Sequence, residues 1–99
     1  MTAYLIANLQ VTDPAKFATY GQQVAPLIAR YGGRYLVRGG AVTPVEGDPG
    51  LQRLVIVEFA ELATLKQFYD SDEYAPLIRL RQSAATGSVA LVEGYTPPA

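Results

Sequence analysis

The chain has 99 residues and a formal net charge of -1, with 49% hydrophobic and 17% charged residues, which is the balance of one small globular domain. A slightly acidic chain is poorly suited to phosphate backbones or anionic lipid, so nucleic acid and membrane surfaces are not expected partners. Cysteine and histidine are both absent, which removes disulfides, the usual ligands of zinc and haem iron, and the commonest general base; we expect no metal and no cofactor.

The first two elements follow from local patterns. Residues 3–11 form an apolar run of strand length. Asp13 can accept hydrogen bonds from the free amides of a first helical turn, and Pro14 suits the first helical position. The helix is predicted to run to about Arg30. Its apolar residues recur with helical spacing, at Phe17, Tyr20, Val24, Leu27, Ile28 and Tyr31.

A hairpin is predicted next. Residues 34–38 form a second strand, and the glycine pair at 39–40 indicates a bulge. Residues 41–46 are expected to continue that strand to a turn at 47–50, which is rich in glycine and proline. A third strand at 53–59 completes the hairpin.

The last third of the chain predicts an interrupted helix and one more strand. The helix begins near Glu61, breaks at Ser71 and resumes through Arg81. A strand over 88–94 follows, and residues 96–99 form a short C-terminal tail.

An internal repeat fixes how these elements combine. At an offset of 50, residues 4–9 match 54–59, and the tetrapeptide Ala-Pro-Leu-Ile occurs at 25–28 and again at 75–78. The repeat predicts two βαβ halves in one domain, 1–95. The expected fold is α+β: a ferredoxin-like βαββαβ sandwich, with a four-stranded antiparallel sheet and the helices on one face.

The strands are apolar on both faces. Leu5, Ala7 and Leu9 alternate with Tyr4 and Ile6, and the third strand shows the same pattern. A sheet face open to water would carry polar residues, so we expect a second copy of the chain to cover the face without helices, as a homodimer.

Two charged residues and several tyrosines are the candidate site. Arg38 and Glu58 are predicted to meet on adjacent strands, and the repeat places Asn8 close to Glu58. One interpretation is a cross-strand ion pair that fixes the strand register or the dimer interface. The other is a polar centre in a ligand pocket lined by tyrosines; helical spacing is equally typical of core tyrosines. The tyrosines are Tyr4, Tyr20, Tyr69 and Tyr74.

Four segments carry a resemblance to a known family: YGGRYLVRGG (31–40), RLVIVEF (53–59), FYDSDEYAPLIRLRQSA (68–84) and LVEG (91–94). They resemble the family called domain of unknown function 1330, over nearly the whole chain. The resemblance implies a dimeric α/β barrel with a small cavity in each subunit and no established activity. Related barrels include cofactor-free monooxygenases, lactone isomerases and haem enzymes, and the lack of histidine sets this chain apart from the haem-binding ones.

Three functional hypotheses follow. The first is a pocket for a small acidic or phenolic metabolite, with Arg38 orienting an anionic oxygen and Glu58 as a proton acceptor. The second is a cofactor-free enzyme of the monooxygenase or isomerase type that uses the same residues. The third is a structural or regulatory dimer without catalysis. The amino terminus has no signal-peptide pattern, and the cytoplasm is the expected compartment.

Overall fold

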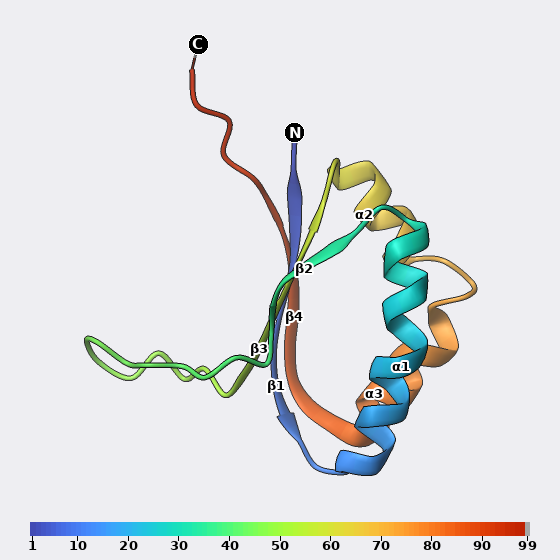
Figure 1. The fold of residues 1–99 in the computed structure, drawn as a ribbon, viewed down its shortest axis with the longest axis vertical. Coiled ribbons are helices and arrows are strands. Elements are labelled where there is room, and N and C mark those ends of the chain that lie inside the picture. The colour runs from blue at the N-terminus through green and yellow to red at the C-terminus, as the bar shows by residue number, and fades with distance from the viewer. Residues whose placement is uncertain (99) are drawn as a thin grey trace.

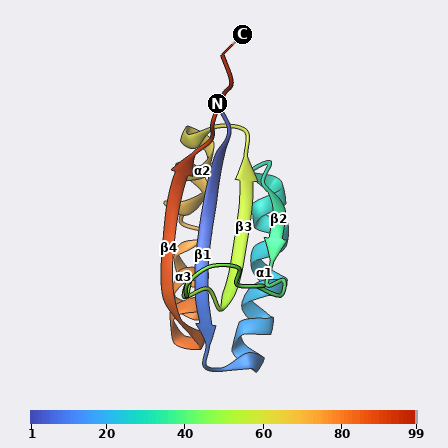
Figure 2. The same ribbon diagram turned by 90° about the vertical axis from the view of Figure 1, so that its left-hand side faces the viewer.

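Four strands form one antiparallel sheet, and three helices cover one of its faces (Figures 1 and 2). The computed structural model describes residues 1–98. The elements are β1 (Ala3–Val11), α1 (Pro14–Arg30), β2 (Arg34–Arg38), β3 (Arg53–Phe59), α2 (Leu62–Tyr69), α3 (Ala75–Ala84) and β4 (Ala85–Glu93). The strand order β2-β3-β1-β4 confirms the predicted ferredoxin-like α+β fold. Within the described residues, no helix is both long and apolar enough to cross a membrane.

The start of α1 agrees with its sequence signals. The Asp13 carboxylate accepts a hydrogen bond of 3.1 Å from the Lys16 backbone amide, and Pro14 opens the helix. After Arg30, the chain turns through Gly32 at a φ of +79°, a backbone angle that glycine adopts without strain. The first helix therefore has the predicted bounds.

The connection between β2 and β3 differs from the prediction. Residues 41–46 are not a strand, and the whole segment 39–52 forms an arm that projects from the sheet, on the side opposite the helices (Figure 1). Gly39, Gly47 and Gly50 have positive φ angles, which interrupt an extended chain. Asn8 fixes the base of the arm through two hydrogen bonds of 2.9 Å, one donated to the Gly50 carbonyl and one accepted from the Gln52 amide.

Two smaller differences concern β2 and β4. The bulge lies between Tyr35 and Val37 rather than at Gly39, because the register of β2 against β3 shifts there. The last strand begins at Ala85, earlier than predicted, since all nine residues of β1 find partners in β4. Gly87 lies within this added stretch of strand.

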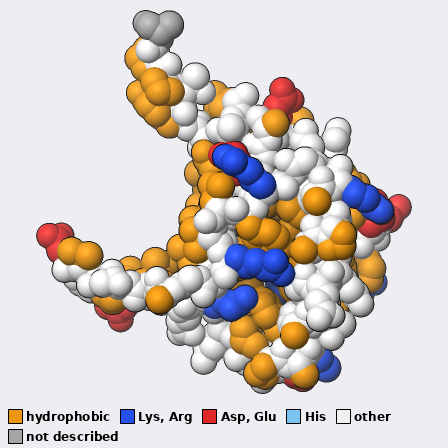
Figure 3. Space-filling model, viewed as in Figure 1, with side chains coloured by type: hydrophobic (Ala, Val, Ile, Leu, Met, Phe, Trp, Pro, Cys, Tyr) orange, Lys and Arg blue, Asp and Glu red, His pale blue; other side chains and the backbone are white. Residues whose placement is uncertain are grey.

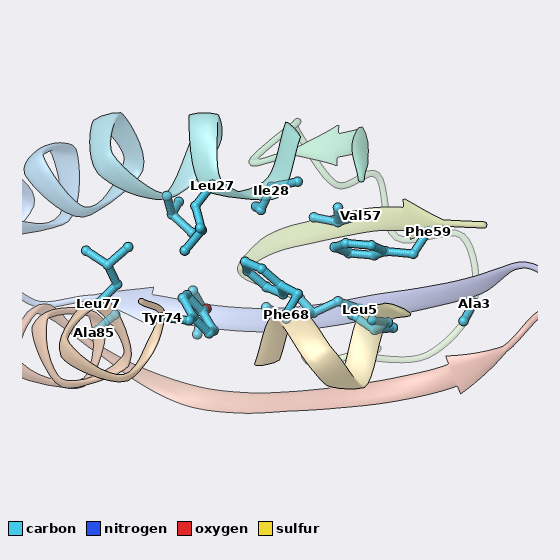
Figure 4. Close-up of a cluster of buried hydrophobic side chains, with 14 residues drawn as sticks. Ala3, Leu5, Leu27, Ile28, Val57, Phe59, Phe68, Tyr74, Leu77 and Ala85 are labelled. Atoms are coloured by element: carbon cyan, nitrogen blue, oxygen red, sulfur yellow. The ribbon is translucent and has the colours of Figure 1, made fainter. Parts of the chain in front are cut away.

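The hydrophobic core fills the space between the sheet and the helices (Figure 4). Its largest fully buried side chains are Tyr74, Phe59, Phe68, Leu65, Val24 and Val57. The Phe68 ring stacks on Tyr74 with 4.4 Å between centroids and lies 5.5 Å from Phe59. These aromatic contacts join α2 and the start of α3 to β3.

The other face of the sheet is apolar and has no covering element within residues 1–98. Ile6, Leu54 and Ile56 lie on this outer face, and Leu36 and Val92 are exposed there by 46% and 43%. Figure 3 shows the face as a concave, largely hydrophobic border between the arm and the C-terminal segment.

A substitution at Gly87 tests how closely the backbone of β4 approaches that of β1. The Gly87 φ of +138° is disfavoured for other residues, and an added Cβ would overlap the Asn8 carbonyl oxygen. We expect Gly87→Ala to lower the free energy of unfolding by about 2 kcal/mol or more. Gly40→Ala is the control, because a Cβ there meets open space. Urea unfolding of both variants measures the difference, and equal stabilities would contradict the close approach.

Candidate functional site

A cavity of about 290 Å³ lies between the inner face of the sheet and the helices. Its floor is apolar and comes from β1 and β3, through Leu5, Ala7, Leu9, Val55 and Val57. Phe17 and Gly21 of α1 and Tyr35 of β2 form the side near the sheet edge. Figure 3 looks onto that edge and shows Lys and Arg side chains beside an apolar hollow. The volume is at the lower end of the range for ligand pockets, about 300–1,000 Å³.

The wall of this cavity carries three arginines, Arg38, Arg53 and Arg81. They come from β2, β3 and α3. Among the described lining residues there is no aspartate or glutamate, and the ion pairs found in residues 1–98 involve Arg30 and Arg34 instead. The cavity is therefore positively charged in a chain whose net charge is -1.

The bulge in β2 places two of the lining side chains. Tyr35 lies opposite Val57 and Arg38 lies opposite Val55, and both valines face the helices. Residues three apart on a regular strand point to opposite faces. The extra residue, Leu36, lets Tyr35 and Arg38 share the inner face, where the Arg38 guanidinium lies 4.5 Å from the centre of the Tyr35 ring.

Arg53 is held at the end of the cavity near the arm. Its guanidinium lies 5.0 Å from the centre of the Phe17 ring. A Cβ at position 39 would overlap this guanidinium, so Gly39 provides the space for it. The Arg53 Nε is buried without a hydrogen-bond partner in the described part of the chain, which is costly for a charged group.

A hydrogen-bonded chain lies on the helix side of the cavity. The Tyr20 and Tyr74 hydroxyls are 2.7 Å apart, and Arg81 Nη1 donates to the Tyr74 hydroxyl at 3.2 Å. Arg81 is only 6% exposed and Tyr74 only 1%. Tyr69 packs edge-on against Tyr74 at 5.5 Å.

Burial and neighbouring groups shift the pKa values of these hydrogen-bonded side chains. Burial raises the pKa of Tyr20 far above its usual 10.0, and the neighbouring Tyr74 hydroxyl raises it further. Burial also raises the pKa of Tyr74, although Tyr20 and the charge on Arg81 oppose that shift. Burial disfavours the charged form of Arg81, but interactions with Tyr69, Tyr74 and Tyr20 outweigh this, and the pKa of Arg81 is raised. The tyrosines therefore stay neutral and the arginine stays charged.

The structure brings part of the predicted site together. Tyr20, Arg38 and Tyr74 line the cavity, and Tyr69 packs behind Tyr74. Tyr4, Asn8 and Glu58 do not line it. They lie on the other face of the sheet, because they alternate with the inward residues of β1 and β3.

The predicted contact between Arg38 and Glu58 is wrong. Glu58 lies opposite Arg34, whose Nε donates to its carboxylate at 2.8 Å. The same register places Tyr4, not Asn8, opposite Glu58. The bulge turns Arg38 inward, and Asn8 is at the far end of β1, bound to the arm.

Among the arginines and tyrosines that line the cavity, three were not predicted site residues: Tyr35, Arg53 and Arg81. Two of them have a signal in the sequence. Arg53 shares the strand parity of Val55 and Val57, and Arg81 lies on the apolar side of α3, one turn after Leu77. Tyr35 has none, because its position relative to Arg38 depends on the bulge.

Comparisons with known proteins agree with this fold. Residues 2–95 match the family described as domain of unknown function (DUF1330). The RPA0582 protein of unknown function from Rhodopseudomonas palustris is similar in structure, with a TM-score of 0.74, 16% identity, and coverage of 97% of this chain and 84% of that one. SnoaB, a cofactor-independent oxygenase from Streptomyces nogalater, has a TM-score of 0.69, 14% identity, and coverage of 97% and 95%. No match was found among curated proteins.

The raised tyrosine pKa values predict a loss of stability at high pH. Unfolding returns both hydroxyls to a pKa near 10, so their contribution is complete below that pH and is lost as the pH rises above it. The free energy of unfolding should fall by up to about 1.4 kcal/mol per pH unit for each tyrosine. We expect a shallower fall in Tyr20→Phe, measured by urea unfolding between about pH 9 and 11. Tyr95→Phe, at a ring that is 79% exposed, is the control; a slope identical to that of the parent in Tyr20→Phe would contradict the assignment.

Proposed function

This chain belongs to the DUF1330 family, and we propose that it binds a small acidic or phenolic molecule in the cavity between its sheet and its helices. The shape supports this proposal, because the cavity is concave and apolar with a few polar groups directed into it. Its 290 Å³ equals the volume of about ten water molecules, enough for a small organic molecule.

One observation carries the proposal: three arginines line the cavity and no carboxylate among the described lining residues neutralises them. Arginine stays charged at physiological pH. Placing positive charges around an apolar cavity costs free energy unless an opposite charge is present. An anionic ligand would supply that charge, and the aromatic rings around the cavity favour a flat ligand.

Catalysis is the second candidate, and the site supports it less. The likeness to an oxygenase concerns the fold, and a shared fold does not carry a reaction. Glu58, the expected proton acceptor, lies on the other face of the sheet with Arg34. The described wall of the cavity has neither a carboxylate nor a histidine to accept a proton, whereas its arginines and tyrosines are donors suited to binding.

We also propose that two copies of the chain pair through the outer face of the sheet. Ile6, Leu54 and Ile56 form its centre, and Leu36 and Val92 leave apolar surface exposed. Burying this face against itself would remove that surface from water, and an interface of standard size buries about 1,200–2,000 Å². The cavity lies on the opposite side of the sheet and would stay accessible.

Ligand binding is tested with an anion and its neutral analogue. We expect benzoate to raise the melting temperature and benzamide, which has nearly the same shape, to have little effect. Arg38→Met and Arg53→Met should each weaken benzoate binding about tenfold or more, because each removes charge-assisted hydrogen bonds. Arg79→Met removes an equal charge from an exposed position outside the cavity and is the control. Equal responses to benzoate and benzamide would contradict the proposal.

Dimerisation is tested by sedimentation. The parent chain should sediment as a dimer at micromolar concentration, and Ile56→Asp should shift it to a folded monomer, because a carboxylate in the centre of the interface would be buried without a partner. Ala63→Asp adds the same charge at an exposed position of α2 and should leave the dimer intact. A monomeric parent chain that stays folded would rule the interface out.

A further inference from the structure

We infer that the ligand has two oxygen-bearing ends, with a carboxylate held at Arg38 and Arg53 and a phenolic or keto oxygen held at the Tyr20–Tyr74 pair. The inference rests on the proposed binding function and specifies its ligand as an aromatic acid with a second oxygen opposite the carboxylate. We call Arg38 and Arg53 the sheet end of the cavity, because they belong to β2 and β3. Tyr20, Tyr74 and Arg81 are its helix end.

The sheet end has donors without acceptors. Arg38 makes one long hydrogen bond, of 3.3 Å, from Nη2 to the Gly21 carbonyl. The Arg53 Nε is buried and has no hydrogen-bond partner among residues 1–98. A guanidinium has five N–H donors in a planar fork that matches the two oxygens of a carboxylate. Two such forks beside an apolar cavity are suited to a carboxylate and not to a neutral group.

The helix end has one hydroxyl hydrogen to spare. Tyr20 and Tyr74 together have two O–H donors, and the bond between them uses one. The Tyr74 oxygen also accepts a hydrogen bond from Arg81. A guanidinium only donates, so Arg81 cannot accept the second hydroxyl hydrogen. Whichever tyrosine donates to the other, one O–H remains for a ligand oxygen. The charge of Arg81, which donates to the Tyr74 hydroxyl, makes the remaining O–H of the pair a stronger donor.

The two ends make separate hydrogen bonds. Arg38 donates to the Gly21 carbonyl, whereas Arg81 donates to the Tyr74 hydroxyl. Between the ends lies the apolar floor of β1 and β3, which includes Ala7 and Val55. Such a floor accommodates an aromatic ring and offers no polar partner to its middle. A ligand that fills the cavity therefore carries its oxygens at its two ends.

The test uses three one-ring probes: para-hydroxybenzoate, benzoate and phenol. We expect para-hydroxybenzoate to bind the parent chain about fivefold more tightly than benzoate, and about tenfold or more tightly than phenol, in isothermal titration. Salicylate has its hydroxyl beside the carboxylate, where it cannot reach the helix end. It should bind no more tightly than benzoate.

Variants assign each oxygen to its end. In the double variant Tyr20→Phe/Tyr74→Phe, the gain in affinity from the para-hydroxyl, measured against benzoate, should disappear. The gain in affinity from the carboxylate, measured against phenol, should stay. In Arg38→Met, the gain from the carboxylate should shrink while the gain from the hydroxyl stays. Arg79→Met should keep both gains. Thermal melts establish that each variant folds, and the salicylate comparison needs no variant.

The outcomes separate this inference from the binding function. Benzoate binding with no gain from the para-hydroxyl, or with an equal gain from salicylate, overturns the two-ended ligand and leaves the binding function standing. A hydroxyl gain that is undiminished in the double tyrosine variant, or a carboxylate gain that is undiminished in Arg38→Met, also overturns it. No binding of any probe overturns both proposals.

Discussion

Neighbouring side chains on a β-strand point to opposite faces of the sheet, and this alternation decides which residues can reach the cavity. β1 and β3 keep it throughout, so Leu5 and Val57 face the helices. β2 breaks it once, at Leu36. Without the bulge, Arg38 would point to the same face as Arg34, away from the cavity. With it, the cavity gains a cation and the outer face keeps one balanced ion pair.

Tyr74 links the core of the protein to its cavity. Its ring stacks on Phe68 and is fully buried, while its hydroxyl bonds to Tyr20 and accepts from Arg81. The side chain is thus positioned by packing, and the packing in turn fixes where its oxygen lies. The position of Arg81 follows, since Arg81 donates a hydrogen bond to this hydroxyl. A rigid aromatic cluster therefore supports a polar group that would otherwise be costly to bury.

The sequence predicts the framework better than the site, for a physical reason. The apolar runs define β1 and β3 to the residue, and Asp13 with Pro14 marks the start of α1, because these signals are local. The bulge in β2 has no comparable signal, and one extra residue reverses every side chain beyond it. The predicted meeting of Arg38 with Glu58 failed because the register of the hairpin places Arg34, not Arg38, opposite Glu58. The arm at 39–52 was also not predicted. Residues 41–46 were expected to continue the second strand, but they pair with no strand in the structure.

The shortness of β2 has a consequence for solubility. An edge strand exposes unpaired amide and carbonyl groups, on which a strand of another molecule can grow by backbone pairing. β2 is only five residues long and is bulged in its middle, so it offers an interrupted and twisted template. The bulge that turns Arg38 into the cavity therefore also protects this sheet edge against fibril-like association.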